Sequence, residues 1–447
     1  MVEVRNRRWT GLAEHHREQL RLLLVDALAL AAAGTASRDA QRVLAGLRAV
    51  GGGEVAVPWT DLRLSAPTAV VATSTLIHAW DFDDTHDEAV VHTASVVVPT
   101  VLAAAATAGA DGARVADGLV TGVHLLSRLA RMTGPRPGVI RTAGLGSLAA
   151  AASAATVWGL PDNQVEHAMA LSLGAALAPG TRQAVVDGSV AKRIQPGLAA
   201  QFGITAAAMA AQGVEGPKGW LSGEFGLTPG SGARWDDLFS GEFEGSWVAL
   251  KPYPACRYTH AALAAAEDLR DRHPHWADIE QVRVHVPKGS AYELVSRPYE
   301  DRGAPLVDAQ FSIPWQLAAL WVTGRYDLST LHGGDLDNPD IAAAAARVTV
   351  EQDLPASAVM TGARVEVRTT SGSHTTEAPM PGAEGTSWET LTRKVESCLR
   401  VAAHDDPARA TVELRQLAEH LPELDAPGLV AALRRCAPTT SDRNERR

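Results

Sequence analysis

A series of alanine-rich, apolar segments with helical spacing runs through the first half of the chain and is the strongest constraint on its fold. Two of them, SLAAAASAATVWGL and GLAAQFGITAAAMAAQG, are apolar on nearly every side, which is typical of helices buried among other helices. The expected helices are 11–34, 68–80, 94–109, 114–132, 146–158, 163–177 and 197–212. The sequence therefore predicts a large helical core.

The periodicity changes in a glycine-rich passage at 228–250. Alternating residues, which are typical of strands, follow at 281–287, 346–353 and 363–372. The last stretch precedes SHTTEAP, which we expect to be its hairpin partner, and a helix from Asp308 to Thr323 is predicted between the strands. Helical periodicity returns from Ser387.

These changes predict a mainly α protein, with a large all-α helical domain built from both chain ends and a smaller α+β domain between them. At 447 residues the chain exceeds one ordinary core, so two domains are expected. The expected boundaries are 1–248 and 387–437 for the helical domain, 249–386 for the α+β domain and 438–447 for a disordered tail.

Composition argues against several classes of protein. A net charge of −10 disfavours a nucleic-acid or anionic-membrane partner. No apolar run has the length of a membrane span, and the start lacks a signal-type apolar core, so we expect a cytoplasmic protein. Cys256, Cys398 and Cys436 are too scattered for a disulfide framework or a CxxC metal site. No GxGxxG follows a predicted strand, and P-loop and GxSxG motifs are absent.

The segment HAWDFDDTHDEAVVH, residues 78–92, lies between two apolar stretches and is the leading site candidate. Its acidic residues and histidines are Asp81, Asp83, Asp84, Asp87, Glu88, His78, His86 and His92. Carboxylates between buried segments must pair, hydrogen-bond, bind a metal or take up a proton, and each outcome perturbs their pKa values. A solvated loop would explain the acidic residues alone, but the three histidines favour a function.

Part of this segment matches DDxxD, the magnesium motif of class I terpene cyclases, through Asp83 and Asp87. Asp236, Ser240 and Glu244 resemble the second metal motif of those enzymes. That motif sits among glycines, whereas ligands at such spacing need a continuous helix to face one ion. Aromatic residues, which would wall a carbocation cavity, are only 5% of the chain. The match is interpreted as coincidence.

Two further segments carry polar chemistry. Lys192 and Arg193 precede an apolar helix expected to begin near Pro196, and cations at a helix N-terminus form a good anion site. An ordinary basic helix start explains the same residues, and on this evidence alone it is the simpler reading. KPYPACRYTH, residues 251–260, falls at the expected domain boundary, where ligand clefts tend to form, although a rigid linker would also look like this.

Together these motifs resemble the MmgE/PrpD family, which includes 2-methylcitrate dehydratase and cis-aconitate decarboxylase. The resemblance rests on HAWDFDDTH, TAGLGSLAAAASAATVWGL, VAKRIQPGLAAQFGITAAAMAAQGVEGPKGWL, KPYPACRYTH and AQFSIPW, in this order along nearly the whole chain. It implies an all-α domain from both chain ends, a smaller α+β lid domain, a homodimer, and catalysis without a metal or an organic cofactor.

The resemblance also implies residue roles. Asp81, Thr85 and His92 look like active-site residues, and Lys192 and Lys251 like lysines that hold the carboxylates of a small substrate. His92 would be the principal acid/base at the carbon next to a carboxylate, with Asp81 orienting its imidazole. The other residues expected to line the cleft are Arg193, Arg257 and His260.

The sequence also departs from the family pattern. Where the family usually has the histidine of a GxHPTA-like stretch, this chain reads GVIRTA and has Ile140. Cys256 and Gln195 stand where the decarboxylase branch has further histidines. Ile140 removes a proton carrier and an anion contact, and the adjacent Arg141 could supply the charge but is a poor proton shuttle.

The sequence thus predicts a cofactor-independent lyase or isomerase that acts by proton transfer on a small carboxylated metabolite. Because Ile140 and Cys256 make the pocket more apolar, we expect a substrate with less charge than methylcitrate. Two alternatives stay open: a magnesium-dependent terpene cyclase using Asp83 and Asp87, and a family member that binds a ligand without catalysis. The intact His92 argues against the second alternative.

Overall fold

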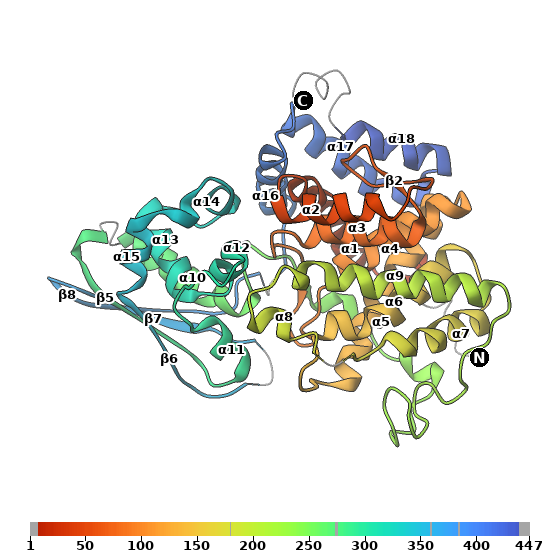
Figure 1. Ribbon diagram of the computed structural model, residues 1–447, viewed down its shortest axis with the longest axis horizontal. Helices are drawn as coiled ribbons and strands as arrows, with labels where there is room; N and C mark the ends of the chain where they lie inside the picture. The colour runs from red at the N-terminus through yellow and green to blue at the C-terminus, as the bar shows by residue number, and fades with distance from the viewer. Residues whose placement is uncertain (1–7, 179, 273–275, 358–359, 383–384, 438–447) are drawn as a thin grey trace.

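The computed structural model describes residues 8–178, 180–272, 276–357, 360–382 and 385–437. The described chain is mainly α, as predicted, and contains eighteen α-helices. A helical body lies on the right of Figure 1, and a smaller part that combines a sheet with helices lies on the left. The tail predicted at 438–447 falls outside the described residues.

The helical body is built around α6 (Arg141–Val157) and α9 (Ala191–Ala211), which pack against each other. A Cβ atom at Gly203 of α9 would lie only 2.4 Å from the carbonyl oxygen of Ser147 in α6, so glycine permits this close approach. The surrounding helices are α1 (Glu14–Gly34), α3 (Ala66–His78), α4 (Ala94–Ala108), α5 (Gly112–Thr133) and α7 (Asp162–Ser172). The predicted helical segments are therefore confirmed, with small shifts at their ends.

Helix α2 (Arg38–Ala49) was not predicted, because only Ala40 and Leu44 of it are buried and its apolar stripe is short. Ser37 begins it by accepting a hydrogen bond from the Ala40 amide. Further short elements of the body are β1 (Val55–Ala56), β2 (Arg63–Leu64), β3 (Thr85–His86), α8 (Gln183–Val186), β4 (Val248–Ala249) and the 3₁₀ helices Trp235–Phe239 and Glu244–Trp247.

The α+β part extends from α10 to β8 and holds a four-stranded sheet in the order β6-β5-β7-β8. Strands β5 and β6 are parallel, whereas β5–β7 and β7–β8 are antiparallel. The strands are β5 (Ile279–Pro287), β6 (Val348–Leu354), β7 (Ala363–Thr369) and β8 (Gly372–Ala378), as predicted. The helices are α10 (His260–Arg272), α11 (Ser290–Val295), α12 (Pro305–Gln310), α13 (Ile313–Thr323), α14 (Leu328–His332) and α15 (Pro339–Ala345).

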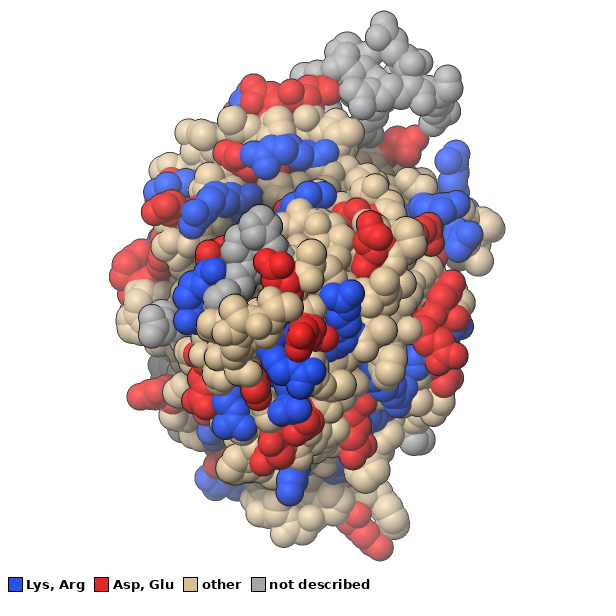
Figure 2. Space-filling model, turned by 90° about the vertical axis from the view of Figure 1, so that its left-hand side faces the viewer, with Lys and Arg blue, Asp and Glu red and all other residues tan. Residues whose placement is uncertain are grey.

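The sheet presents a charged face to solvent. Arg283 of β5 contacts Glu351 of β6 and Glu366 of β7, so opposite charges pair across neighbouring strands. Figure 2, which views the molecule from the left-hand side of Figure 1, shows basic and acidic side chains interspersed over that end of the molecule.

The helix predicted from Asp308 to Thr323 is two helices, which corrects that expectation. Helix α12 ends at Gln310, and α13 begins at Ile313 after Phe311 and Ser312. The Ser312 hydroxyl accepts from the Trp315 amide and starts a new helix, which periodicity alone cannot signal. The break places the side chains of Gln310 and Phe311 next to the functional site described below.

The last three helices return to the helical body: α16 (Trp388–Val401), α17 (Pro407–Glu419) and α18 (Ala426–Cys436). Helices α16 and α17 pack on α1, at the upper right of Figure 1. Lys394 of α16 forms a buried ion pair with Asp26 of α1 over 2.7 Å. It also donates to the Phe82 carbonyl and lies 4.0 Å from the centre of the Phe82 ring, so the C-terminal helices support the segment 78–92.

Within the described residues, no single helix combines the length and hydropathy of a membrane span, and only the bent pair α1–α2 meets that test jointly.

Candidate active site

The segment 78–92 connects α3 to α4 and is buried at most of its positions. Its strand β3 pairs with β4, Thr85 opposite Ala249, which brings the segment beside Lys251. Asp81 and Val90 have left-handed backbone conformations, with φ of 50° and 51°. Such conformations are costly for residues other than glycine and are concentrated at functional sites.

Asp81 is the centre of a buried cation cluster. Lys192 donates to both of its carboxylate oxygens at 2.9 Å, Lys251 donates to one at 2.8 Å, and the Arg193 guanidinium lies 3.0 Å away. Burial opposes ionisation of Asp81, but the three cations outweigh it and hold the pKa of this carboxyl well below its usual range. Three cations around one carboxylate leave an excess of two positive charges, which suits a bound anion.

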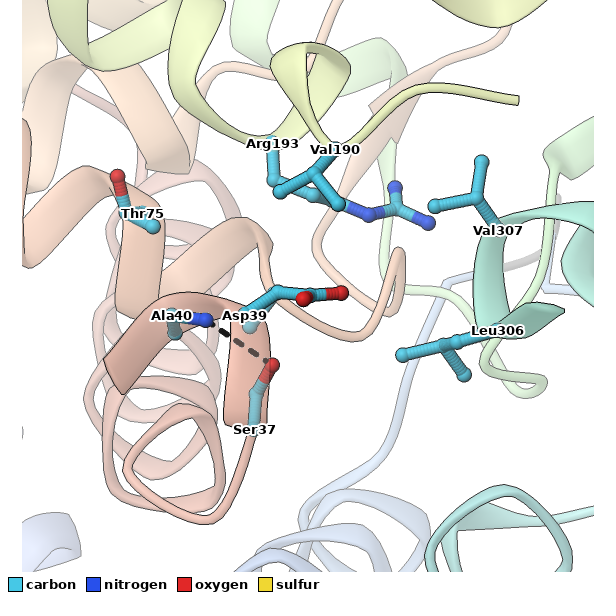
Figure 3. Close-up of a pocket in the computed structure, with 9 residues that line it drawn as sticks. Ser37, Asp39, Ala40, Thr75, Val190, Arg193, Leu306 and Val307 are labelled. Carbon is cyan, nitrogen blue, oxygen red and sulfur yellow. Dashed lines mark hydrogen bonds between the residues drawn. The ribbon is translucent and has the colours of Figure 1, made fainter. Parts of the chain in front are cut away.

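Burial lowers the pKa of Lys192 to about 8, although Asp81 opposes the shift. The expectation that Lys192 and Arg193 precede their helix is wrong. Helix α9 begins at Ala191, so both lie in its first turn, and Pro196 is inside the helix. Figure 3 shows Arg193 extending from α9 toward Val307 of α12. Its guanidinium donates to the Gln310 side chain and thereby ties the α+β part to the cluster.

The prediction that Asp81 orients His92 is also wrong, because Asp81 is occupied by the lysines. His92 Nδ1 instead lies 2.7 Å from the backbone carbonyl of Asp84, and its nearest carboxylate partner is Asp83, at 3.8 Å. A carbonyl oxygen can only accept, so Nδ1 donates to Asp84 and a neutral His92 carries its lone pair on Nε2. Burial lowers the pKa of His92 to about 3, so the ring is neutral at physiological pH.

Two aspartates hold the histidines in place. The Asp83 carboxylate accepts from His78 Nδ1 at 2.8 Å, and the Lys192 ammonium lies 3.3 Å from His78 Nε2. Asp84 accepts hydrogen bonds from the backbone and hydroxyl of Thr93 and from the Ala94 amide. Burial and the adjacent Asp83 raise the pKa of Asp84 to about 7 in spite of these donors. The network fixes the His92 ring against the start of α4.

A cavity of about 240 Å³ opens beside this network. The predicted site residues that line it are Asp81, Thr85, His92, Ile140, Lys192, Lys251, Cys256 and Arg257. Two predicted lining residues are not among those that line this cavity. Arg193 reaches toward α12, and His260 is buried between the Ala255 carbonyl, 3.2 Å from its Nε2, and the Arg257 guanidinium, 3.3 Å from its Nδ1.

Further lining residues were not selected from the sequence, notably Arg136, Tyr258, Arg182, Phe311 and Met360. Tyr258 lies within the motif KPYPACRYTH and Phe311 within AQFSIPW, so the sequence carries a signal for both residues. Arg182 and Met360 come from segments without a motif. Burial raises the pKa of the Cys256 thiol to about 11, so Cys256 faces the cavity as a neutral thiol.

The terpene-cyclase alternative is contradicted by the partners of its proposed ligands. Asp83 is bonded to His78, whereas Asp87 forms a bidentate pair with Arg257 at 2.7 and 2.8 Å. In the second motif, Glu244 pairs with arginines of α5, and the Ser240 hydroxyl accepts from one of them. The two acidic motifs therefore do not converge on one ion.

One group of possible metal ligands adjoins the cavity: His78, Asp83 and His92, whose ligand atoms lie within 4.8 Å of one another. Each Nδ1 is already a hydrogen-bond donor, to Asp83 or to the Asp84 carbonyl, and Lys192 lies beside His78. These residues fit a hydrogen-bonded acid/base network better than a cation site. A second group, His285, Glu351 and Asp353, lies on the charged sheet.

The fold and site define a mainly α protein whose buried cations and neutral histidine meet at a small cavity, an arrangement able to hold an anion and move a proton. Comparison with known sequences identifies the family within this class. The chain belongs to the MmgE/PrpD family: the model of the MmgE/PrpD N-terminal domain matches residues 4–233, and that of the C-terminal domain matches 253–419.

Curated relatives include a cis-aconitate decarboxylase from Aspergillus terreus, 28% identical over 353 residues, which covers 71% of this chain and 70% of that protein. The cis-aconitate decarboxylase of Homo sapiens is 25% identical over 311 residues, covering 65% of this chain and 62% of its own length. The family resemblance inferred from the motifs is thus confirmed.

Proposed function

We propose that the protein is a lyase of the MmgE/PrpD type that acts by proton transfer on a small carboxylated metabolite, with no metal or organic cofactor. The observation that carries this proposal is the state of His92. The ring is neutral and lines the cavity, Nδ1 is committed to the Asp84 carbonyl, and Nε2 has no hydrogen-bond partner among the described residues. Lys192 and Lys251 line the same cavity.

The chemistry follows from these positions. A substrate carboxylate is held by the charge excess of the Asp81 cluster, which also stabilises negative charge developing at the adjacent carbon. In a dehydration, His92 Nε2 takes the proton from that carbon while hydroxide leaves from the next carbon. In a decarboxylation, carbon dioxide leaves and the electron pair of the broken bond takes a proton; His92 would have to be protonated before it could deliver one, and its pKa of about 3 makes that state scarce at neutral pH. Both reactions need one proton carrier at the same place.

We further propose that the substrate differs from cis-aconitate, the substrate in the names of the relatives. Ile140 lies in the cavity wall and cannot carry a proton or bind an anion, and Cys256 is a neutral thiol. The cavity therefore suits a substrate with less charge than a tricarboxylate.

We also propose that the protein is a homodimer, as the resemblance implies. Leu198, Phe202 and Met209 form an apolar stripe on α9 and are 51%, 46% and 40% exposed. A second copy of the chain would cover this stripe. Light scattering should give the mass of a dimer, and Phe202→Glu should shift it toward a monomer; a Phe202→Glu dimer of unchanged stability would contradict this surface.

The function is tested with a panel of small carboxylic acids that includes cis-aconitate and 2-methylcitrate. Release of carbon dioxide and the absorbance of conjugated double bonds report decarboxylation and dehydration. We expect turnover of at least one acid, unchanged by EDTA, and at most slow turnover of the two named acids. Binding of acids without any turnover would favour the non-catalytic alternative, and loss of activity in EDTA would contradict the cofactor-free proposal.

A further inference from the structure

The outer wall of the active-site cavity carries a second group of polar residues that the proposed chemistry does not use. Arg141 is the first residue of α6, Arg182 immediately precedes α8, and Tyr258 belongs to the 3₁₀ turn Arg257–Thr259. All three line the cavity, and all three are partly exposed, unlike the buried Lys192 and Lys251. They therefore lie nearer to solvent than the Asp81 cluster does.

The two guanidinium groups lack anionic partners. Among the described residues, no carboxylate lies within ion-pair distance of Arg141 or Arg182; Arg182 donates only to the Ser290 carbonyl, at 3.1 Å. By contrast, Arg257 in the same wall is paired with Asp87. Tyr258 lines the same cavity as both arginines, and burial raises the pKa of its phenol to about 12, so it stays a neutral hydrogen-bond donor at physiological pH. A phenol and two unpaired guanidinium groups in the lining of one cavity are a set of donors suited to a carboxylate.

The positive charges in the lining of the cavity are enough for two separate anionic groups. The inner cluster has an excess of two positive charges, enough for one carboxylate next to His92. Arg141 and Arg182 add two further positive charges, and a third comes from Arg136, which also lines the cavity and donates to the Leu227 carbonyl. Apolar side chains, among them Ile140, Leu294 and Met360, share the wall with both groups. A substrate with an acidic group at each end and an apolar stretch between them complements this distribution.

We propose that Arg141, Arg182 and Tyr258 form a distal carboxylate subsite, so that the substrate is an elongated dicarboxylate whose second acid group is remote from the reacting carbon. This inference rests on the proposed function, because it assigns the inner cluster to the reacting end. It also explains the loss of a family histidine at Ile140: the anion contact moves one residue along the chain, to Arg141, and becomes separate from the proton carrier.

Binding of simple acids to the full-length chain tests the subsite. The probes are linear dicarboxylates from succinate to suberate and the monocarboxylates of equal chain length, titrated by calorimetry at neutral pH. We expect the best dicarboxylate to bind at least about tenfold tighter than its monocarboxylate, which corresponds to about 1.4 kcal/mol. The double variant Arg141→Met/Arg182→Met should lose this preference, Arg141→Lys should keep most of it, and the exposed control Arg42→Met should keep all of it.

A preference that survives in Arg141→Met/Arg182→Met would overturn the subsite, as would equal binding of the two kinds of acid by the unaltered chain. The circular dichroism spectrum and melting temperature of each variant show whether it is folded, and Arg141→Lys/Arg182→Lys provides a second, charge-retaining comparison. Lys192→Met should weaken dicarboxylates and monocarboxylates alike. If the subsite does not exist, small acids are still turned over. If the proposed function is wrong, acids bind but are not turned over.

Discussion

His92 donates from Nδ1 to the backbone carbonyl of Asp84 over 2.7 Å, and this contact determines which nitrogen can move a proton. The carbonyl accepts only, so the lone pair of the neutral ring is on Nε2, and the His92 side chain lines the cavity. Burial holds the ring neutral by lowering its pKa to about 3. A backbone carbonyl, rather than the carboxylate of Asp81, therefore fixes the tautomer of the proposed catalytic base.

The pH dependence of activity should reflect Lys192. Burial lowers its pKa from the ordinary value of 10.5 to about 8, so the cation that holds the substrate is lost as the pH rises through about 8. We expect kcat/KM to fall about tenfold per pH unit above that value. The arginine in Lys192→Arg stays charged, so the fall in kcat/KM should move to higher pH in this variant. If kcat/KM falls at the same pH in Lys192→Arg, a group other than Lys192 causes the fall.

A histidine at position 140, where the family resemblance implies one, should change the substrate range. Ile140→His places an ionisable group in the cavity wall, where it can bind an anion and carry a proton. Because general acid–base catalysis contributes about 10²–10⁴-fold, we expect kcat/KM for cis-aconitate to rise at least about tenfold. Ile140→Asn, which is polar but does not titrate, is the matched control. An equal gain in both variants would attribute the effect to polarity alone.

The Cys256 thiol should be unreactive at neutral pH. Its pKa is raised to about 11 by burial, so the nucleophilic thiolate is scarce. Iodoacetamide labelling followed by mass spectrometry should be at least about tenfold slower than labelling of a free cysteine. Cys256→Ser should retain activity; loss of activity in Cys256→Ser together with rapid labelling would indicate a catalytic thiol.

The buried pair of Asp26 and Lys394 should make a large contribution to stability. Lys394→Met leaves Asp26 buried without its cation and removes the donor to the Phe82 carbonyl. Loss of one partner of a buried pair costs roughly 3–5 kcal/mol, measured as the free energy of unfolding in urea. The double variant Asp26→Asn/Lys394→Met should recover much of this loss. If the double variant is no more stable than Lys394→Met, an unpaired charge is not the cause.

Much of the fold could be predicted because the buried helices are apolar around their whole circumference and the strands alternate. Hydrophobic periodicity did not predict the break at Ser312, because the break depends on a single serine cap. It did not predict α2 either, because that helix buries few residues. In the site, the motifs identified His92 and the lysines. The hydrogen-bond and ion-pair partners of these residues could not be predicted from the sequence. They depend on the two-residue pairing of β3 with β4 and on the first turn of α9.

In the proposed reaction His92 carries the proton, so the variant His92→Asn should lose turnover. Initial rates with the best substrate of the acid panel should be compared for the unaltered chain, His92→Asn and His285→Asn, the control, whose histidine lies on β5 against Asp353. We predict that His92→Asn loses at least about a hundredfold in kcat while keeping its melting temperature and its affinity for the acid, and that His285→Asn is unaffected. Turnover by His92→Asn at the rate of the unaltered chain would contradict this account.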